Sequence, residues 1–174
     1  MEVEIAKILI DTRQKAGKHR NVDGWLASHG VEYGYRKLDF GDYMREGSNI
    51  SVDTKQGLDE LAQNLGKDNR RFVRECDRAA AAGCRLVVLV EGGERWADAS
   101  ALASWACWAC RRCGRCDPND PASRCSRYRS KPMHGARLLG TMATIEKRHG
   151  ARFEFCERSD TARAICDTLG VKYD

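Results

Sequence analysis

Four residues of this chain have the types and spacing that hydrolytic chemistry needs. Asp11 ends a short apolar run near the N-terminus, Asp42 follows a glycine, and Asp53 and Lys55 are separated by one residue. Residues two apart on a strand point to the same side, so Asp53 and Lys55 project together from a predicted hairpin. Asp42 lies on the partner strand and can come beside them. The spacing therefore predicts three carboxylates and one lysine near one another at the ends of strands.

Carboxylates that are gathered in this way indicate a metal site. They repel one another unless a cation lies between them, and Mg²⁺ or Mn²⁺ prefers oxygen ligands. Hydrolysis of a phosphodiester needs a metal that lowers the pKa of the attacking water and offsets the charge growing on the phosphoryl oxygens. Lys55 would add a fixed cation that orients the water or stabilises the pentavalent state. The alternative is that Asp53 and Lys55 form only a surface ion pair.

The elements that would position these residues follow an α/β pattern. Apolar runs and alternating residues predict strands over 5–11, 31–37, 42–45, 49–55, 85–91 and 151–155. Apolar residues at helical spacing predict helices near 22–29, 58–65, 72–80, 97–109, 138–145 and 162–169. We expect one domain over residues 1–174, with helices flanking a sheet whose middle strands are antiparallel and whose outer strands can be parallel.

The order of these motifs resembles a known family. The stretches IDTRQ, LDFGDY, VDTKQGLDEL, NRRFVREC and LVVLVE are similar, in order and spacing, to the nuclease domain of XPF-type structure-specific endonucleases. That family is a branch of the PD-(D/E)xK fold, and the chain most resembles its compact phage-type members. The resemblance implies a restriction-endonuclease-like mixed sheet flanked by helices. It also implies a Mg²⁺-dependent endodeoxyribonuclease that cuts flaps, forks or junctions in DNA repair or recombination.

The resemblance assigns roles to the four residues that the spacing had singled out. Asp11 matches the aspartate of the family's first strand, Asp42 the aspartate of its Gly-Asp pair, and Asp53 the acid of its acid-Arg-Lys triplet. These are the metal ligands of the family. Lys55 matches the triplet lysine, which is catalytic in the family.

Further residues match positions around that site, with two departures. Arg13 and Arg71 match arginines expected near the scissile phosphate, and Asp59 matches an aspartate that supports the site from its helix. Gln14 stands where the family has glutamate, so one metal-coordinating or supporting carboxylate is lost. Thr54 replaces the arginine of the triplet, and the acid of the triplet is aspartate rather than glutamate. The resemblance thus implies catalysis with altered metal affinity.

The positive charge of the chain is concentrated in one segment. The 174 residues carry a net charge of +5, whereas residues 105–137 alone hold eight basic and two acidic residues. The remainder of the chain is therefore close to neutral. Clustered arginine gains affinity for a polyanion by releasing phosphate counterions, so the segment predicts a nucleic acid partner. The alternative is a solvated loop.

Cysteines gather in the same place. Four of the nine cysteines follow a strict spacing of three, and Cys125 comes shortly after them. The acidic N-terminus is unlike a signal peptide, so metal ligation is a better interpretation than disulfides. Zn²⁺ is the favoured ion, a [4Fe-4S] cluster is the second choice and free thiols are the third. The preferred ligands, followed by the alternates Cys107 and His134, are Cys110, Cys113, Cys116 and Cys125.

Residues 105–131 are thus expected to be a Cys/Arg-rich, metal-binding insertion within the nuclease domain. The insertion has few apolar residues, so a bound ion would supply its stability. Arg111, Arg112 and Arg115 lead a set of arginines that could contact DNA phosphates as a fixed patch. The alternative is an insertion that only packs on the nuclease body.

The remaining expectations concern location, assembly and rival functions. No apolar run is long enough to span a membrane, so we expect an intracellular protein, in the cytoplasm or nucleoid, including that of a phage host, rather than a secreted one. The resemblance implies a possible homodimer. One rival is a catalytically inactive nucleic-acid-binding module with the same fold, as Gln14 suggests. A second rival is a metal or redox sensor built on the cysteine cluster.

Overall fold

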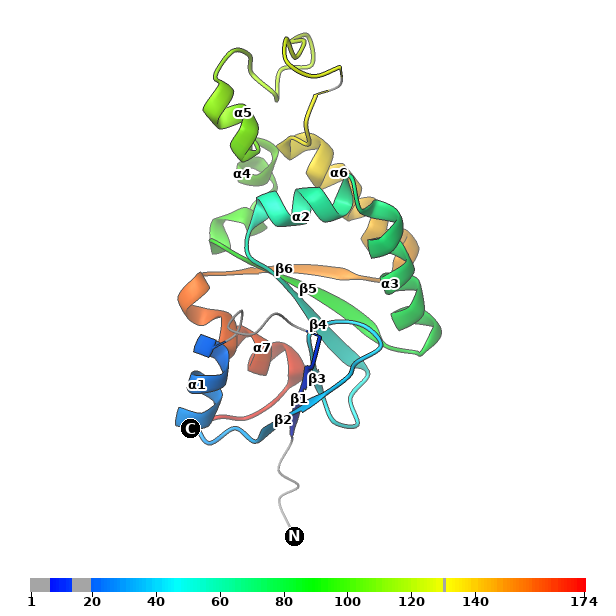
Figure 1. Ribbon diagram of the computed structural model, residues 1–174, viewed down its shortest axis with the longest axis vertical. Helices are drawn as coiled ribbons and strands as arrows, with labels where there is room; N and C mark the ends of the chain where they lie inside the picture. The colour runs from blue at the N-terminus through cyan, green and yellow to red at the C-terminus, as the bar shows by residue number, and fades with distance from the viewer. Residues whose placement is uncertain (1–6, 14–19, 130) are drawn as a thin grey trace.

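A six-stranded sheet forms the centre of the computed structural model, which describes residues 7–13, 20–129 and 131–174 (Figure 1). The strands are β1 (Ile8–Asp11), β2 (Tyr33–Arg36), β3 (Tyr43–Arg45), β4 (Ile50–Lys55), β5 (Arg85–Glu91) and β6 (Arg152–Cys156). They lie in the order β2-β1-β3-β4-β5-β6. The predicted acidic residues thus belong to neighbouring strands, since β1 ends at Asp11, β3 follows Asp42 and β4 contains Asp53.

The strand directions bring the ends of three strands to one edge. β3 is antiparallel to both β1 and β4, while the other three pairs are parallel. The expectation of antiparallel middle strands and parallel outer ones is confirmed. It follows that β1, β4 and β5 run in the same direction. Their last residues, Asp11, Lys55 and Glu91, lie at the same edge of the sheet.

Helices cover both faces of the sheet. They are α1 (Arg20–Ser28), α2 (Leu58–Leu65), α3 (Asn69–Ala81), α4 (Ala99–Ala103), α5 (Trp108–Cys113), α6 (Gly135–His149) and α7 (Thr161–Leu169), with 3₁₀ turns η1 (Glu94–Ala97) and η2 (Arg158–Asp160). α2, α3 and α6 lie on one side of the sheet, and α1 and α7 on the other (Figure 1). Among the described residues, no helix is long and apolar enough to cross a membrane.

The sheet separates two apolar cores, and β5 contributes to both. Val88 and Val90 pack toward α2, α3 and α6, whereas Val87 and Leu89 pack toward α1 and α7. A strand that is buried on both faces needs a continuous apolar run, which explains the sequence of residues 85–91.

The hairpin between β3 and β4 fixes which way the acidic residues of β4 point. Gly47 closes the turn at a φ of +73°, and Ser48 N donates to the carbonyl of Arg45 at 3.0 Å. Val52 packs in the core beneath α1 and α7. Strand periodicity then directs Asp53 and Lys55 to the opposite face, where α2 and α3 lie.

The Cys/Arg-rich segment comprises residues 105–131, and its described part extends beyond α2 at one end of the molecule (Figure 1). The helix expected over residues 97–109 is a wrong prediction, because η1, α4 and α5 occupy that stretch as separate elements. Asn119 Nδ2 donates to the carbonyls of Ser104 and Trp105 at 3.0 and 3.3 Å. Gly135 N donates to Trp105 O at 2.8 Å. These contacts use carbonyls that a continuous helix would need.

Candidate active site

Asp11 is the last residue of β1, and its carboxylate is held from two sides. The residue is buried, and Oδ1 accepts a hydrogen bond from Leu38 N at 3.1 Å. Arg13 Nε lies 2.9 Å from Oδ2, and the same guanidinium donates to the carbonyl of Leu38. Arg13 nevertheless keeps 52% of its side chain exposed. Arg13 therefore fixes the carboxylate and still presents a positive charge to solvent.

Asp42 is positioned by the glycine that precedes it. Gly41 has a φ of +70°, and a Cβ at this position would lie 2.1 Å from Ser51 Oγ. That hydroxyl donates to the carbonyls of Phe40 and Tyr43, at 3.1 and 3.2 Å. A residue with a side chain would displace Ser51 and lose both hydrogen bonds. The Gly-Asp motif is thus a steric requirement of this turn.

The backbone of Asp42 links two strands of the site. Asp42 N donates to Val52 O at 2.7 Å, and Asp42 O accepts from Asp11 N at 2.8 Å. The Asp42 side chain also meets β4, because its Oδ2 accepts from Thr54 N at 3.0 Å and from Thr54 Oγ1 at 2.5 Å. Thr54, which replaces the arginine of the family triplet, therefore serves here as a donor to Asp42.

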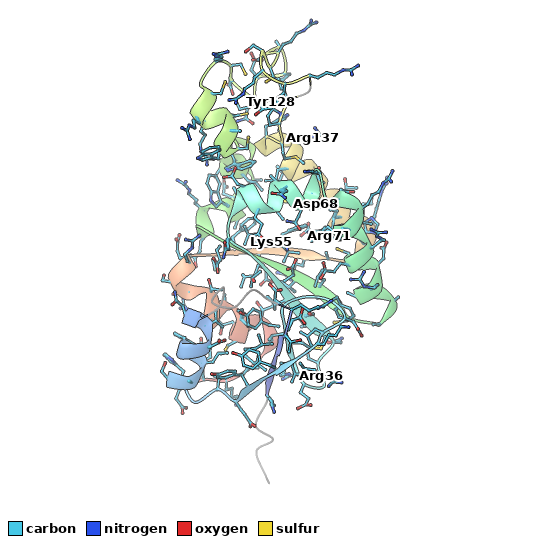
Figure 2. The ribbon with its side chains drawn as sticks, viewed as in Figure 1. Arg36, Lys55, Asp68, Arg71, Tyr128 and Arg137 are labelled. Atoms are coloured by element: carbon cyan, nitrogen blue, oxygen red, sulfur yellow. The ribbon has the colours of Figure 1, made fainter. Side chains whose placement is uncertain are left out.

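Asp53 and Lys55 form a buried ion pair on β4. Lys55 Nζ lies 2.6 Å from Asp53 Oδ2, and the side chains of Lys55 and Asp53 are 9% and 8% exposed. Figure 2 shows Lys55 at the end of β4 that lies beside α2. The ammonium also stands 5.9 Å from the ring centroid of Phe72 on α3. The pair is therefore enclosed between the sheet and its helices, and it is not a surface ion pair.

Burial and neighbouring carboxylates change how the pair holds its protons. Burial raises the pKa of Asp53, Lys55 lowers it, and Asp42 and Glu75 raise it again, so that the result is about 7. Burial alone would lower the pKa of Lys55, but the charge and hydrogen bond of Asp53 raise it above its ordinary value. Lys55 is consequently a stable cation at neutral pH, whereas Asp53 titrates there.

Glu75, on α3, is a residue of this site that the sequence analysis missed. Its Oε1 accepts a hydrogen bond from Gly41 N at 3.0 Å, and its charge contributes to the raised pKa of Asp53. One signal could have identified it. Glu75 follows Phe72 by three residues, so both occupy the helix face that packs over Lys55.

Three other residues were expected near the site: Arg71, Asp59 and Gln14. Arg71 is at the beginning of α3 (Figure 2), where it is 70% exposed and stands 3.9 Å from Asp68. Asp59 is engaged by the Cys/Arg-rich segment, since its carboxylate accepts from Trp108 N at 2.6 Å and lies 3.2 Å from Arg111. Gln14 falls outside the described residues.

The arginines of the Cys/Arg-rich segment are mostly exposed. Arg111 donates to the carbonyl of Ala106 as well as pairing with Asp59. Arg112 stacks over the ring of Trp108, 5.2 Å from its centroid. Arg115 is also exposed. These cations belong to a surface that is separate from the buried carboxylates of the sheet edge.

The donor chemistry of the sheet edge fits a hard divalent cation. Among residues 7–13, 20–129 and 131–174, no three His, Cys, Asp or Glu side chains are arranged as a ready-made metal cage. Each carboxylate instead contacts a donor of the protein: Asp11 contacts Arg13, Asp42 contacts Thr54 and Asp53 contacts Lys55. The oxygens are nonetheless of the type that Mg²⁺ and Mn²⁺ prefer. An added cation would also reverse the rise in the pKa of Asp53.

Four thiols of the Cys/Arg-rich segment interact with one another. Burial and a hydrogen bond with Cys107 raise the pKa of Cys110 to about 12, and Cys116 and Cys125 contribute as well. Cys125 Sγ accepts from Tyr128 N at 3.3 Å. Contacts with backbone N–H groups and with Cys116 lower the pKa of Cys125. Cys107, an alternate in the predicted ligand set, thus contacts Cys110 directly.

Comparisons with known proteins agree on one family. The model described as "ERCC4 domain" matches residues 10–168. The solved structure of "XPF from Aeropyrum pernix" superposes on 94% of this chain with a TM-score of 0.59 and 22% sequence identity. The chain covers 63% of that protein, so it spans less than two thirds of its length. No curated protein matches the chain.

The mixed sheet with its flanking helices is an α/β nuclease fold of the XPF type. The chain belongs to the ERCC4 domain family. Both the predicted fold class and the resemblance are confirmed, and the chain is an XPF-type nuclease domain. Nucleases of this type act on DNA and in general depend on divalent metal ions.

Proposed function

We propose that this chain is a metal-dependent endonuclease that hydrolyses phosphodiester bonds of DNA at Asp11, Asp42, Asp53 and Lys55. The observation that carries the proposal is the buried pair of Asp53 and Lys55, whose side chains are 8% and 9% exposed. Burying two charges costs free energy that a surface pair avoids. Because this costly pair lies beside two further carboxylates, a catalytic role for the pair is a better interpretation than a stabilising one.

Asp11, Asp42 and Asp53 would hold Mg²⁺ or Mn²⁺. When bound, the ion lowers the pKa of the attacking water and offsets negative charge on the phosphate. Asp53 has to lose its proton to act as a ligand, and its pKa of about 7 makes that step easy at neutral pH. Arg13 and Thr54 keep Asp11 and Asp42 turned toward the sheet edge.

Lys55 acts as a fixed cation and not as a base. Its raised pKa keeps the ammonium charged at neutral pH, so it has no lone pair with which to take a proton. A positive charge that is already in place can stabilise a phosphoryl group that becomes more negative during attack, without reorganisation. Asp53 holds Lys55 in that position.

Two arginines would contact the DNA backbone near the cut. Arg13 is half exposed beside Asp11, and Arg71 is mostly exposed at the start of α3. Exposed guanidinium groups bind phosphate with two parallel hydrogen bonds. Gln14 supplies an amide where the family has a carboxylate, so the metal would depend more on the three aspartates.

Branched DNA is the substrate class that we propose, and a homodimer is the proposed assembly. Both come from the resemblance to XPF-type endonucleases, which the family match supports at the level of DNA cleavage. The exposed arginines of the Cys/Arg-rich segment, Arg111, Arg112 and Arg115, would add contacts to phosphates outside the cut.

The test uses labelled flap, fork, four-way, linear duplex and single-stranded DNA, each with Mg²⁺, Mn²⁺ or EDTA. Wild type is compared with Asp53→Ala and with Asp174→Asn, a matched control at an exposed acid at the C-terminus. We expect metal-dependent cutting of branched DNA that Asp53→Ala removes and Asp174→Asn keeps. Binding without cutting by wild type, under every metal condition, would support the inactive binding module instead.

We also propose that the Cys/Arg-rich segment binds one structural Zn²⁺. The contacts of Cys110 with Cys107, Cys116 and Cys125 favour these four thiols as the ligands over the set predicted from spacing, which has Cys113 in place of Cys107. Two of these ligands flank the start of α5, since Cys107 precedes the helix and Cys110 lies in it. An ion shared with Cys116 and Cys125 would tie α5 to the loop that follows.

Metal analysis of the purified protein tests this ligand set. We expect one zinc per chain in wild type and in Cys113→Ser, and loss of zinc in Cys107→Ser. Retention of zinc by Cys107→Ser together with its loss from Cys113→Ser would restore the set predicted from spacing alone. Iron with a visible chromophore would instead indicate a [4Fe-4S] cluster and favour a sensor.

A further inference from the structure

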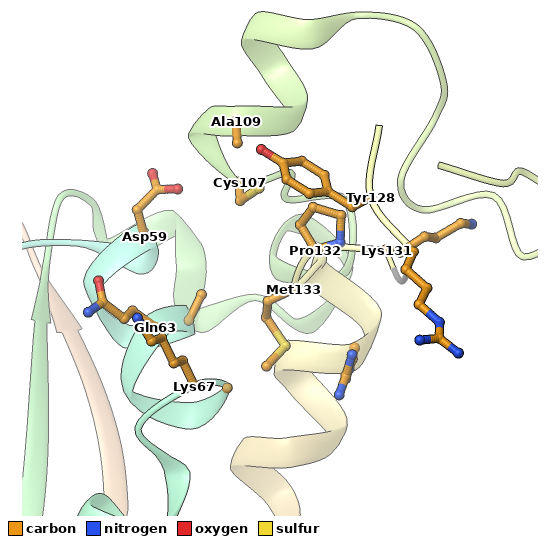
Figure 3. Close-up of a pocket in the computed structure, with 13 residues that line it drawn as sticks. Asp59, Gln63, Lys67, Cys107, Ala109, Tyr128, Lys131, Pro132 and Met133 are labelled. Carbon is orange, nitrogen blue, oxygen red and sulfur yellow. The ribbon is translucent and has the colours of Figure 1, made fainter. Parts of the chain in front are cut away.

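A hollow of about 710 Å³ lies between α2, the Cys/Arg-rich segment and the beginning of α6 (Figure 3). Its size falls in the range of small-ligand sites, about 300–1,000 Å³. Figure 3 shows Tyr128 standing over Pro132, across the opening from Asp59 and Gln63 on α2. The hollow is separate from the buried carboxylates of the sheet edge.

The rim of the hollow is strongly positive. Four of its lining residues are cations, and only one, Asp59, is an acid. Asp59 is already neutralised by Arg111, 3.2 Å away. The exposed side chains of Lys67, Arg129 and Arg137 have no ion pair among the described residues, so their charges are free for an anion. The fourth cation, Lys131, donates to the carbonyl of Asp120.

The walls of the hollow are apolar and include one accessible aromatic ring. Ala62, Met133 and Pro132 line it, and Met133 packs against the main core. Tyr128 is 46% exposed and is one of three exposed large hydrophobic residues in the described part of the chain. Arg127 lies 5.6 Å from the centroid of its ring. An anionic ligand with a flat apolar part would pair with the cations of the rim and pack against the apolar walls.

We propose that this hollow binds an unpaired nucleotide of the DNA substrate, with the base against Tyr128 and the flanking phosphates on Lys67 and Arg137. The inference rests on the proposed DNA-cleaving function and adds a site for single-stranded DNA to it. Bases of a duplex are stacked and paired, so they cannot enter a concave site, whereas an unpaired base can stack on an aromatic ring.

A second hollow lies beside the first and extends to Glu91 at the end of β5. It has a volume of about 530 Å³ and shares Asp59 with the first. Its lining includes Gly57, two residues after β4, Glu91, the last residue of β5, and the exposed Arg111. A single-stranded arm could follow this surface from the end of β5 along α2. The route gives a physical basis for a preference for forked or flapped DNA.

Fluorescence anisotropy in EDTA tests the proposal without cutting. Labelled oligothymidine and a labelled duplex are titrated with wild type, Tyr128→Ala, Tyr128→Phe and the double variant Lys67→Gln/Arg137→Gln. The double variant Arg85→Gln/Lys172→Gln is the control, since it removes two exposed cations outside the hollow. Tyr128→Phe keeps the ring, so it separates stacking from any effect of the hydroxyl or of folding.

We expect Tyr128→Ala to weaken binding of oligothymidine about tenfold, with little change for duplex, and Tyr128→Phe to bind like wild type. The double variant of Lys67 and Arg137 should lower the salt dependence of oligothymidine binding, by about 0.7 in logarithmic slope per lost phosphate contact. The control variant Arg85→Gln/Lys172→Gln should lower the salt dependence of oligothymidine binding less.

Equal loss of duplex and single-strand binding in Tyr128→Ala, or no loss of either, would overturn the hollow as a site for unpaired DNA. Cutting by wild type is scored in a separate reaction with Mg²⁺. A protein that cuts branched DNA but binds oligothymidine equally with Tyr128→Ala keeps its proposed function and loses this site. A protein that never cuts but shows the expected binding pattern keeps this site and loses its proposed function.

Discussion

Lys55 Nζ lies 2.6 Å from Asp53 Oδ2, and both side chains are enclosed between the sheet and the helices that cover it. The two groups lose their protons at different pH values, because the pKa of Asp53 is about 7 while that of Lys55 is raised above its ordinary value. At neutral pH this pair therefore combines a permanent cation with a carboxyl group that titrates.

Removal of the Asp53 carboxyl should flatten the pH dependence of stability in EDTA. The pKa of Asp53 is about 7 in the folded chain and 3.8 in an unfolded one, so the folded state holds an extra proton between these values. Stability of wild type then falls as pH rises through this window, because unfolding releases that proton. Above pH 7 the contribution stays constant. Asp53→Asn should lose this slope, as measured by denaturant unfolding at several pH values.

Asp174→Asn is the control for that series, because it removes an exposed carboxyl that lies away from the pair. Its slope should match that of wild type. A slope in Asp53→Asn that is as steep as in wild type would contradict the prediction, because it would show that Asp53 is already ionised at low pH in the folded chain.

Gly41→Ala should destabilise the fold by more than about 2 kcal/mol. The added Cβ would lie 2.1 Å from Ser51 Oγ, and the φ of +70° is unfavourable for alanine. The turn that carries Asp42 would have to shift, so cutting should fall as well. Thermal and urea unfolding measure the first effect, and a cleavage assay measures the second.

Gly47→Ala separates strain from steric clash in this test. Gly47 has a φ of +73°, but a Cβ added at this position would meet no atom within 4 Å. Only the backbone cost of about 1 kcal/mol should remain, and cutting should be unchanged. Equal losses of stability in the two variants would mean that Ser51 moves aside freely and that the Gly-Asp turn tolerates a side chain.

Asp59→Ala should loosen the Cys/Arg-rich segment with little effect on global stability. Trp108 N would lose its acceptor and Arg111 its partner, so amides of residues 107–113 should exchange faster with deuterium. The ion pair is about half exposed, and such pairs contribute about 1 kcal/mol or less. Asp160→Ala removes a comparably exposed pair with Arg163 and should leave exchange in this segment unchanged. Unchanged exchange in Asp59→Ala would show that other contacts hold the segment.

The strand that carries the site could be predicted because its pattern is local. In β4, alternation assigns Val52 to one face and Asp53 and Lys55 to the other, and the turn at Gly47 fixes the register. The antiparallel direction of β3 followed from the short turn that joins it to β4. The three carboxylates were therefore predictable as a group of strand-end residues.

Contacts between distant segments were not predictable from the pattern. Glu75 contacts the turn at Gly41 because α3 packs over the sheet, and its spacing from Phe72 does not indicate which turn it meets. Asp59 meets Trp108 across 49 residues. The helix expected over residues 97–109 is interrupted because Asn119 and Gly135 use the carbonyls of Ser104 and Trp105. In each case tertiary contacts determined the local structure, which helix periodicity alone does not indicate.

The most direct test of the central claim is the single-turnover cutting rate of a forked DNA in saturating Mg²⁺. Wild type is compared with Asp53→Asn and Asp174→Asn, which make the same chemical change at the candidate site and at an exposed position. Asp53→Asn should slow cutting by about 10²-fold or more, with DNA binding retained, and Asp174→Asn should cut like wild type. Cutting by Asp53→Asn at the wild-type rate would contradict the assignment of the catalytic site to this end of the sheet.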